Sequence, residues 1–332
     1  DTDTWFAGVS WAVNDEIRLR VNQSTALRAP NVFDLYVGIN TGLVDLSTGE
    51  NGLFDPCASA PGVAPSASAA ACARTGATAA QYASGIEDNP AGQYNLITGG
   101  NPNLVAETGE TTTFGVVYTP NWLEGLSVAV DWFDIEVTDA IGSIPAQASL
   151  DGCIAGGSGS GTFCSLIQRD TAGTLWLSND APGGGLAGIS QQNANITSLT
   201  TEGVDINVAY SIEAGDWGSL NLDYAGTILD TLDTVPFAGA NAIKCVDFYA
   251  GQCGLPNPEY THRILGNWIT PVNGLSIAAT WRFVGETTLY GLDKAAASAR
   301  AEQMNDYLEE RDYLDISLRY AVTDNITVRA GV

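Results

Sequence analysis

Apolar and polar residues alternate with a period of two along several stretches of this sequence. In one stretch, Val204, Ile206 and Val208 alternate with Asp205 and Asn207. The pattern recurs in five other stretches, at residues 16–23, 126–132, 275–283, 314–320 and 326–330. Successive side chains of a β-strand point to opposite faces, so this period indicates strands rather than helices. The sequence therefore predicts a sheet with one apolar and one charged face.

Ten candidate strands follow from this period. They cover residues 4–13, 16–27, 109–118, 126–138, 196–213, 218–230, 259–270, 275–287, 311–321 and 325–332. Most are longer than the ~5–6 residues usual for strands of globular proteins. A strand that crosses a bilayer needs ~9–11 residues, so their length is typical of a membrane-spanning sheet.

The connections between these strands alternate between short and long. The short ones are residues 14–15, 119–125, 214–217, 271–274 and 322–324, and the long ones are residues 28–108, 139–195, 231–258 and 288–310. In an antiparallel meander, successive connections lie at opposite ends, so all short turns share one side. Short periplasmic turns and long extracellular loops are typical of outer-membrane barrels. We therefore expect an all-β fold, an antiparallel transmembrane β-barrel.

A soluble β-sandwich would show the same alternation, with its apolar faces packed together. The sequence contains no run of about 18 apolar residues, so it predicts no transmembrane helix. Aromatic residues lie near strand ends, where they form the interfacial girdles of a barrel or cap the strands of a soluble core. They are Trp5, Trp11, Tyr118, Trp122, Trp132, Tyr210, Trp217, Trp268, Trp281 and Tyr320. Together with the turn pattern, they favour the barrel.

The chain is strongly acidic, with 13 Lys and Arg, 38 Asp and Glu, and a formal net charge of −25. Nucleic acid is excluded as a partner, because phosphate binding needs a basic surface. Carboxylates on extracellular loops would instead keep the surface solvated and meet divalent cations that bridge lipopolysaccharide. Asp230, Asp233, Glu309 and Glu310 are either calcium ligands or solvated loop residues, and the lack of an EF-hand spacing favours solvation.

The six cysteines form three groups of near neighbours, all outside the candidate strands. They are Cys57 and Cys72, Cys153 and Cys164, and Cys245 and Cys253. Six cysteines allow 15 connectivities, but the clustering favours pairing within each group. The alternative is a metal site, which the lack of Cys-x-x-Cys spacing and the single histidine disfavour. An even count in loops is typical of disulfides formed in an oxidising compartment.

Two loop segments predict helices, and no segment predicts an enzyme. Residues 57–85 are rich in Ala and Ser and predict one or two helical turns, and residues 293–309 predict a surface helix. The glycine-rich residues 156–161 and 183–185 do not match a phosphate-binding loop. A catalytic triad would have to use His262 without any Gly-x-Ser-x-Gly elbow. We therefore expect neither enzymatic activity nor a cofactor nor a metal site.

Two motifs resemble the family of TonB-dependent receptors. Residues 27–36 resemble its Phe-Arg-Ala-Pro-x-x-x-Glu-Leu-Tyr segment, and residues 100–108 resemble its Gly-Asn-Pro-x-Leu-x-Pro-Glu segment. The matching positions are Arg28, Ala29, Pro30, Asn31, Leu35, Tyr36, Asn101, Pro102, Leu104 and Glu107. Leu27, Asp34 and Ala106 depart from the pattern without removing a charge type. Residues 328–332 are similar to a later strand of the family.

The resemblance implies that residues 1–332 form one partial barrel domain, about ten strands of a barrel of roughly 22. It also implies a bacterial outer-membrane location, contact with lipid and lipopolysaccharide, and coupling to the TonB–ExbB–ExbD system through a plug domain. The plug, the TonB box and the outermost strands are expected outside this chain. The first residues, Asp1 to Trp5, lack the basic and apolar regions of a signal peptide, and both ends of the sequence fall within strand-like segments.

The two motifs are expected to be structural first. Pro30 and Pro102 lack an amide donor, which suits positions where the chain leaves a sheet. Arg28 is expected to bond loop carbonyls or a carboxylate such as Glu107, which would brace residues 28–108 at their base. Direct contact with a ligand is the alternative role.

The resemblance implies energised import of a nutrient such as a metal chelate, a cofactor or an oligosaccharide. Aromatic loop residues are the candidate ligand contacts, namely Tyr82, Tyr94, Trp176, Tyr249 and Tyr290. A passive porin-like channel is the first alternative, and a plug domain encoded upstream would decide against it. A soluble, lectin-like β-domain is the second, and expression without detergent would favour it.

Overall fold

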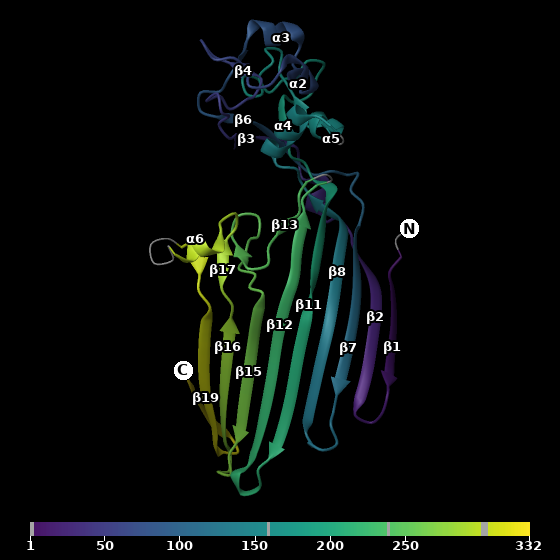
Figure 1. Ribbon diagram of the computed structural model, residues 1–332, viewed down its shortest axis with the longest axis vertical. Helices are drawn as coiled ribbons and strands as arrows, with labels where there is room; N and C mark the ends of the chain where they lie inside the picture. Colours follow the sequence, from purple (N-terminus) through teal and green to yellow (C-terminus); the bar gives the residue numbers. More distant parts are fainter. Residues whose placement is uncertain (1–2, 158–159, 238–239, 300–304) are drawn as a thin grey trace.

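The computed structural model describes residues 3–157, 160–237, 240–299 and 305–332. Its main feature is one twisted sheet of ten long strands, which run side by side in chain order (Figure 1). The strands are β1 (Trp5–Ala12), β2 (Ile17–Arg28), β7 (Glu107–Tyr118), β8 (Leu126–Gly142), β11 (Ala194–Glu213), β12 (Ser219–Val235), β15 (Tyr260–Ile269), β16 (Leu275–Val284), β19 (Arg311–Thr323) and β20 (Ile326–Gly331). Each pairs antiparallel with its neighbour along the chain, and short β13 (Ile243–Lys244) pairs with β12.

All ten strands that the alternation predicts are present, in the predicted antiparallel order. The largest extensions beyond the expected ends are in β8, as far as Gly142, and in β12, as far as Val235. These extensions pair with β11, because Ala194 lies opposite Gly142 and Ser198 lies opposite Val235. The cross-strand pairing therefore lengthens strands past the end of their sequence period.

The register gathers the apolar residues of successive strands on one face of the sheet. Val116 lies opposite Val130, and Val130 lies opposite Ile206. At the other side of the sheet, Ile277 lies opposite Leu318. A shift by one residue would move every side chain to the other face, so these pairs fix which face is apolar.

In the part of the chain that the structure describes, no second layer covers the apolar face of the ten-stranded sheet. Among the described residues, the buried apolar side chains lie in the long connections, apart from Ala140 near the end of β8. Val128, Ile206 and Ile277 are half-buried and Leu318 is exposed. A soluble sandwich would bury these residues between two sheets, so the sandwich alternative is wrong for this part of the chain.

The tight turns lie at one end of the sheet and the long connections at the other, as expected (Figure 1). Two of the tight turns need glycine. Gly125 has φ +85° and Gly218 has φ +84°, a region that other residues rarely adopt. An added Cβ would lie 2.3 Å from the Ser211 carbonyl oxygen at the first turn and 2.1 Å from that of Ile269 at the second.

The first two long connections fold together into one unit, which we call the N-terminal lobe (residues 29–106 and 143–193). Its sheet takes strands from both connections, in the order β3 (Asn40–Asp45), β6 (Gln93–Thr98), β10 (Gly188–Ser190) and β9 (Ile167–Gln168). Around it lie α1 (Val32–Tyr36), α2 (Ala69–Arg74), α3 (Ala79–Ser84), α4 (Ala146–Ala155), α5 (Ser160–Ser165), β4 (Ala58–Ser59) and β5 (Ile86–Glu87). In Figure 1 this lobe stands above the sheet.

The expected helical turns in residues 57–85 are present as α2 and α3. Each begins at a hydroxyl side chain that caps the helix, because Ser68 Oγ accepts from the Ala71 amide and Thr78 Oγ1 accepts from the Gln81 amide. Helices α4 and α5 were not expected. Their packing comes from tertiary contacts, since Leu150 and Cys153 of α4 are fully buried against strands of the lobe.

The last two long connections also fold together, into what we call the C-terminal lobe (residues 236–259 and 285–310). Its sheet joins β14 (Phe248–Tyr249), β17 (Thr287–Leu289) and β18 (Tyr307–Leu308), and α6 (Lys294–Ser298) lies beside it. The helix expected over residues 293–309 is therefore too long. Its described part ends at Ser298, residues 300–304 lie outside the described residues, and Tyr307–Leu308 form a strand because they pair with Thr287–Thr288.

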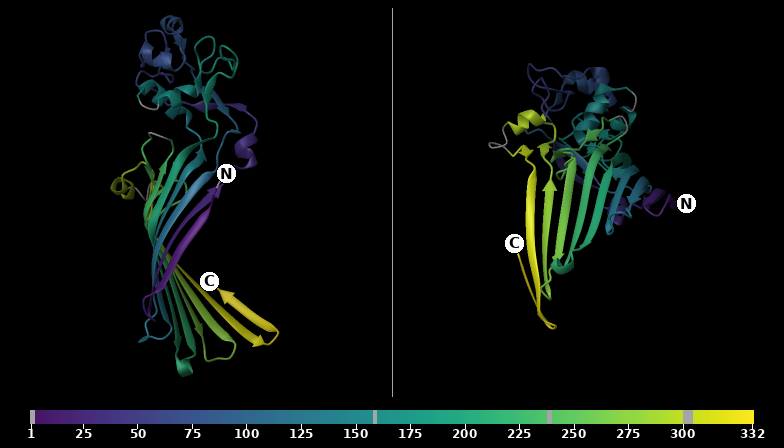
Figure 2. Two further views of the ribbon diagram at one scale, coloured as in Figure 1. Left: turned by 90° about the vertical axis from the view of Figure 1, so that its right-hand side faces the viewer. Right: turned by 60° about the horizontal axis from the view of Figure 1, so that its bottom comes forward.

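Three disulfides join the neighbouring cysteines, as the clustering predicts. They are Cys57–Cys72, Cys153–Cys164 and Cys245–Cys253. The first two lie in the N-terminal lobe and the third in the C-terminal lobe. Within the described residues, no helix is long and apolar enough to cross a lipid bilayer. Figure 2 shows that the long sheet is open, and its edge strands β1 and β20 do not pair with each other.

Candidate functional site

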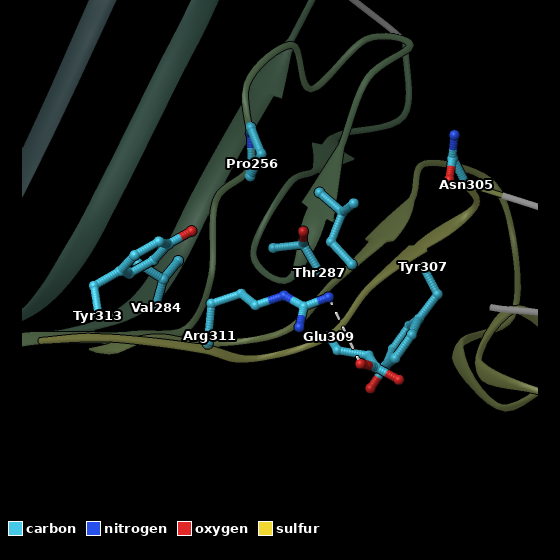
Figure 3. Close-up of a pocket in the computed structure, with 10 residues that line it drawn as sticks. Pro256, Val284, Thr287, Asn305, Tyr307, Glu309, Arg311 and Tyr313 are labelled. Carbon is cyan, nitrogen blue, oxygen red and sulfur yellow. Dashed lines mark ion pairs between the residues drawn. The ribbon is translucent and has the colours of Figure 1, made fainter. Parts of the chain in front are cut away.

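A pocket lies where the long sheet meets the C-terminal lobe (Figure 3). It has a volume of about 600 Å³. Its wall consists of Pro256, Val284, Gly285, Thr287, Asn305, Tyr307, Leu308, Glu309, Arg311 and Tyr313. This volume is within the ~300–1,000 Å³ range of small-molecule sites. We therefore take this pocket as the candidate site for a ligand.

The strand period places the lower wall of the pocket on the polar face of the sheet. Val284 of β16 lies opposite Arg311 of β19, and Tyr313 lies opposite Arg282. These residues alternate with Trp281 and Phe283, which belong to the apolar face. The pocket therefore opens on the face that also carries the charged side chains of the strands.

Two ion pairs set the charge of this wall. Arg311 Nη2 lies 3.8 Å from Glu309 Oε2, and both side chains are more than half exposed. Arg282 Nη2 lies 3.0 Å from Asp315 Oδ2, and the Arg282 guanidinium lies 5.2 Å from the centre of the Tyr313 ring. A guanidinium at this distance from an aromatic ring is attracted to its face. Arg282 therefore contacts the Tyr313 ring, whereas the Arg311–Glu309 pair is too far apart for a hydrogen bond.

A charged cluster behind the pocket holds the C-terminal lobe together. Lys294 Nζ pairs with Glu286 Oε1, and Tyr307 donates a hydrogen bond to Glu286 Oε2. These hydrogen bonds from Lys294 and Tyr307 lower the pKa of Glu286, and the bond to Glu286 raises the pKa of Lys294. The hydrogen bond that Tyr307 donates to Glu286 raises the pKa of Tyr307. The Tyr307 hydroxyl is therefore hydrogen-bonded within the C-terminal lobe, while its ring lines the pocket.

The polar face continues across the sheet from the pocket as a row of charged and hydroxyl groups. Arg20 forms a two-contact ion pair with Asp131 of β8. Asp131 lies opposite Asp205, which accepts a hydrogen bond of 2.6 Å from the Thr227 hydroxyl. Gly115 sits between the partners of the ion pair, and an added Cβ would lie 2.0 Å from Asp131 Oδ1. This face is therefore polar, unlike the apolar face behind it.

The two motifs of the sequence meet at the base of the N-terminal lobe. Arg28 donates two hydrogen bonds to the Glu107 carboxylate, through Nε to Oε2 and through Nη2 to Oε1. Glu107 is buried and also accepts a hydrogen bond of 2.7 Å from the Ile141 amide. The expected Arg28–Glu107 contact is thus present, and it links β2, β7 and β8 where the chain enters the lobe.

Residues around this ion pair support the same junction. Asn31 caps α1 by accepting from the Phe33 and Asp34 amides, and Asp34 accepts from the Asn31 amide in return. The Asn101 side chain donates to the Asn193 carbonyl at 3.0 Å. Gly100 packs so closely on Leu35 that an added Cβ would lie 2.7 Å from its backbone. The remaining motif residues differ in exposure, since Ala29, Tyr36 and Pro102 are exposed while Pro30 and Leu104 are half-buried.

The five aromatic residues proposed from sequence as ligand contacts are not brought together. Tyr94 is fully buried in the N-terminal lobe, where its hydroxyl donates to Asp88, so this candidate is wrong for the described conformation. Burial and this hydrogen bond raise the pKa of Tyr94 far above its usual value.

The other four candidates are partly exposed but make structural contacts. Tyr82 donates to the Ala67 carbonyl, Trp176 donates to the Glu87 carbonyl, and Tyr290 packs edge-to-face on Phe248. Tyr249 donates to the carbonyl of Asn305, a pocket residue. Their roles as ligand contacts stay predictions.

The pocket tyrosines, Tyr307 and Tyr313, were missed. The signal for Tyr313 was its place on the polar face with Asp315 and Ser317, in alternation with Leu314 and Ile316.

The expectations about metals and catalysis concern a few further residues. The described residues contain no group of three or more His, Cys, Asp or Glu side chains arranged to hold a metal ion. Asp233 Oδ2 lies 4.0 Å from Lys244 Nζ.

His262 lies on the apolar face among Tyr224, Tyr260, Trp281 and Phe283, with ring centres 4.7–5.9 Å away. Its surroundings are therefore an aromatic cluster, which offers a triad neither a nucleophile nor an orienting carboxylate.

Comparison with known proteins gives a family and a fold. The whole chain, residues 1–332, matches the family model described as TonB dependent receptor-like, beta-barrel. A search of curated protein sequences found no matching relative. Among solved structures, a mutant of the ferric enterobactin receptor PfeA from Pseudomonas aeruginosa, in complex with enterobactin, is similar with a TM-score of 0.55 and 15% identity. The siderophore receptor PirA from Acinetobacter baumannii is similar with a TM-score of 0.54 and 14% identity.

The two alignments cover nearly all of this chain but a smaller part of each receptor. They include 99% of this chain, 34% of the PfeA chain and 36% of the PirA chain. The chain thus spans about a third of the length of these receptors. At this level of identity, the likeness concerns the fold.

Proposed function

This chain belongs to the TonB-dependent receptor-like β-barrel family, and we propose that it forms part of the wall of a receptor that imports a nutrient captured by its lobes. The family consists of non-enzymatic transport proteins of the bacterial outer membrane. The nutrient is a metal chelate, a cofactor or an oligosaccharide. Its uptake is energised by the TonB–ExbB–ExbD system.

The observation that carries this proposal is the two-sided character of the long sheet. In the described part of the chain, one face gathers the apolar side chains of successive strands and has no protein layer against it, and the other carries ion pairs such as Arg20–Asp131. In a barrel the first face contacts lipid and the second lines an interior. The lobes and the pocket lie at the end with the long connections, where an extracellular ligand first arrives. The apolar face contacts outer-membrane lipid, and the lobes reach the lipopolysaccharide layer.

We further propose that residues 1–332 are one partial barrel domain, and that a plug domain outside this chain fills the interior. Supporting this, the sheet is open at β1 and β20 and the chain spans about a third of the solved receptors. The plug would then face the polar row around Asp131 and Asp205, and it would connect the receptor to TonB.

Conductance measurements test the import function against the passive-channel alternative. The complete receptor that contains this chain is reconstituted in planar lipid bilayers. A plugged importer is expected to show no steady conductance, whereas a persistent open channel would establish the passive alternative. Deletion of TonB in the producing bacterium is the second arm. It is expected to abolish accumulation of the nutrient, and uptake that continues without TonB would contradict energised import.

A further inference from the structure

The lining of the pocket is formally neutral. Among the described residues that line it, Arg311 is the one basic side chain and Glu309 the one acidic side chain. Lys294, the other nearby cation, is already shared by Glu286 and Asp247, at 3.9 Å from the latter. A polyanionic ligand would therefore meet a single guanidinium next to several carboxylates. The electrostatics of this pocket disfavour such a ligand.

A cationic ligand is disfavoured for a related reason. The Tyr313 ring, which would attract a cation, already has the Arg282 guanidinium 5.2 Å from its centre. Arg311 also lines the pocket, and it lies in β19, the strand that contains Tyr313. Because the Tyr313 ring already has a guanidinium partner, it offers little attraction to a further positive charge, so the pocket favours a ligand without net charge.

The shape and polarity of the wall point to a ligand with both apolar faces and hydroxyl groups. Figure 3 shows Arg311 between the Tyr313 and Tyr307 side chains, with Glu309 on the Tyr307 side. Leu308, Pro256 and Val284 add apolar surface, and Asn305 adds an amide. The Arg311–Glu309 distance of 3.8 Å is too long for a hydrogen bond, so both groups can bond a ligand instead.

Building on the proposed import function, we propose that this pocket binds a neutral, polyhydroxylated ligand of the saccharide class. The C–H face of a sugar ring packs on Tyr313 or Tyr307. Arg311 donates to one hydroxyl of the ligand and Glu309 accepts from its neighbour, so the pair recognises adjacent hydroxyl groups. The volume of about 600 Å³ accommodates a short oligosaccharide rather than a single monosaccharide.

Binding to the complete receptor in detergent tests this assignment. The probes are neutral tetrasaccharides derived from starch, cellulose and xylan, and a polyanionic iron(III) tris-catecholate. Affinity is measured by calorimetry for the unchanged receptor and for Tyr313→Ala, Arg311→Gln and Glu309→Gln. We expect at least one tetrasaccharide to bind, and each substitution to weaken that binding about tenfold or more, since each loss removes ~1.4 kcal/mol or more.

Two substitutions in the same strand serve as matched controls. Tyr320→Ala removes a tyrosine from the opposite, apolar face of β19, and Arg319→Gln removes an arginine near the short turns, far from the pocket. Both are expected to leave the saccharide affinity within twofold of the unchanged receptor.

The outcomes separate this inference from the import function. Catecholate binding that Arg311→Gln or Tyr313→Ala weakens would overturn the saccharide assignment and leave the import proposal standing. Failure of every tetrasaccharide to bind, or binding insensitive to the pocket substitutions, would also overturn it. The import function itself depends on the conductance and TonB-deletion results, which do not involve these substitutions.

Discussion

Arg169 is a buried charged side chain of the N-terminal lobe and shows how that lobe is held together. Its guanidinium pairs with Asp55 at 2.6 Å, and both side chains are about 1% exposed. It also donates to the Thr75 hydroxyl and to the Gly173 carbonyl. A buried guanidinium with all of these partners joins residues from both connections of the lobe. Sequence reasoning did not find this pair, because nothing local distinguishes Arg169 from a solvated loop arginine.

Replacement of Arg169 by Met is expected to destabilise the N-terminal lobe strongly. The change leaves the Asp55 carboxylate buried without its partner, which costs about 3–5 kcal/mol. Hydrogen exchange of the lobe amides, followed by mass spectrometry, measures the loss of protection. Lys244→Gln is the control, because the Lys244–Asp233 pair is 4.0 Å long and the lysine is 78% exposed. Equal losses of protection in the two variants would show that burial of an ion pair does not determine its contribution to stability.

The Arg28–Glu107 pair gives a second prediction for single residues. Arg28→Ala removes the ion-pair partner of the buried Glu107 carboxylate and leaves it the hydrogen bond from the Ile141 amide, so protection of that amide should fall. We expect a cost of about 1–3 kcal/mol at this junction and faster proteolysis within the N-terminal lobe. Arg18→Gln, an exposed position of the same strand, is expected to change neither. If Arg28 contacts ligand instead, the variant will lose affinity while its junction stays protected.

At the level of elements, the unexpected feature is that the long connections fold in pairs. Strand β6 of one connection pairs with β10 of the next, and β17 pairs with both β14 and β18. These strands have two to six residues, too few for a two-residue period to be recognised. The long strands were predictable because each repeats its alternation over a membrane's width. The pocket was not predictable, since it depends on how two connections meet.

The second disulfide of the N-terminal lobe, Cys153–Cys164, gives a prediction about its helices. Cys153 of α4 is fully buried and pairs with Cys164 of α5. Replacement of both by Ser removes a cross-link between the helices. We expect the free energy of unfolding of the N-terminal lobe to fall by about 2–4 kcal/mol. Hydrogen exchange should show the loss in α4 and α5. The matched change, Cys245→Ser with Cys253→Ser, should affect the C-terminal lobe instead, and a uniform effect of either change on both lobes would argue against separate folding units.

The Glu286–Lys294 pair makes the stability of the C-terminal lobe depend on pH. The lowered pKa of Glu286 means that its contribution is present above the unfolded value of ~4.3 and is lost as the pH falls through the folded pKa. The raised pKa of Lys294 means that its contribution is present below ~10.4 and is lost as the pH rises further. Both side chains are at least a third exposed, so the effect should be under ~1 kcal/mol.

Amide exchange of Thr287 and Thr288 measures this dependence. The unchanged receptor and Glu286→Gln are compared at each pH, so the intrinsic pH dependence of exchange cancels. Protection in the unchanged receptor should exceed that in the variant at pH 7, and the difference should vanish in strong acid. A difference that grows as the pH falls would contradict the assigned direction of the Glu286 shift.

For the whole molecule, two kinds of stability are combined in one chain. The N-terminal lobe has buried cores, two disulfides and a buried ion pair, as a soluble domain has, and the C-terminal lobe has one disulfide. The ten-stranded sheet is a single layer, and its strands are held by backbone pairing and by whatever covers its apolar face. Lipid supplies that cover in a bilayer. The period of two predicted this division along the strands, whereas the lobes required the folded structure.

The most direct test of the account is the accessibility of neighbouring positions in β11, in the complete receptor within lipid bilayers. Nitroxide labels are placed one at a time at positions 204 to 208, and their collisions with oxygen and with a water-soluble nickel chelate are compared. The account predicts that labels replacing Val204, Ile206 and Val208 favour oxygen, which dissolves in lipid, and that labels replacing Asp205 and Asn207 do not. The same accessibility at all five positions, or the opposite alternation, would contradict it.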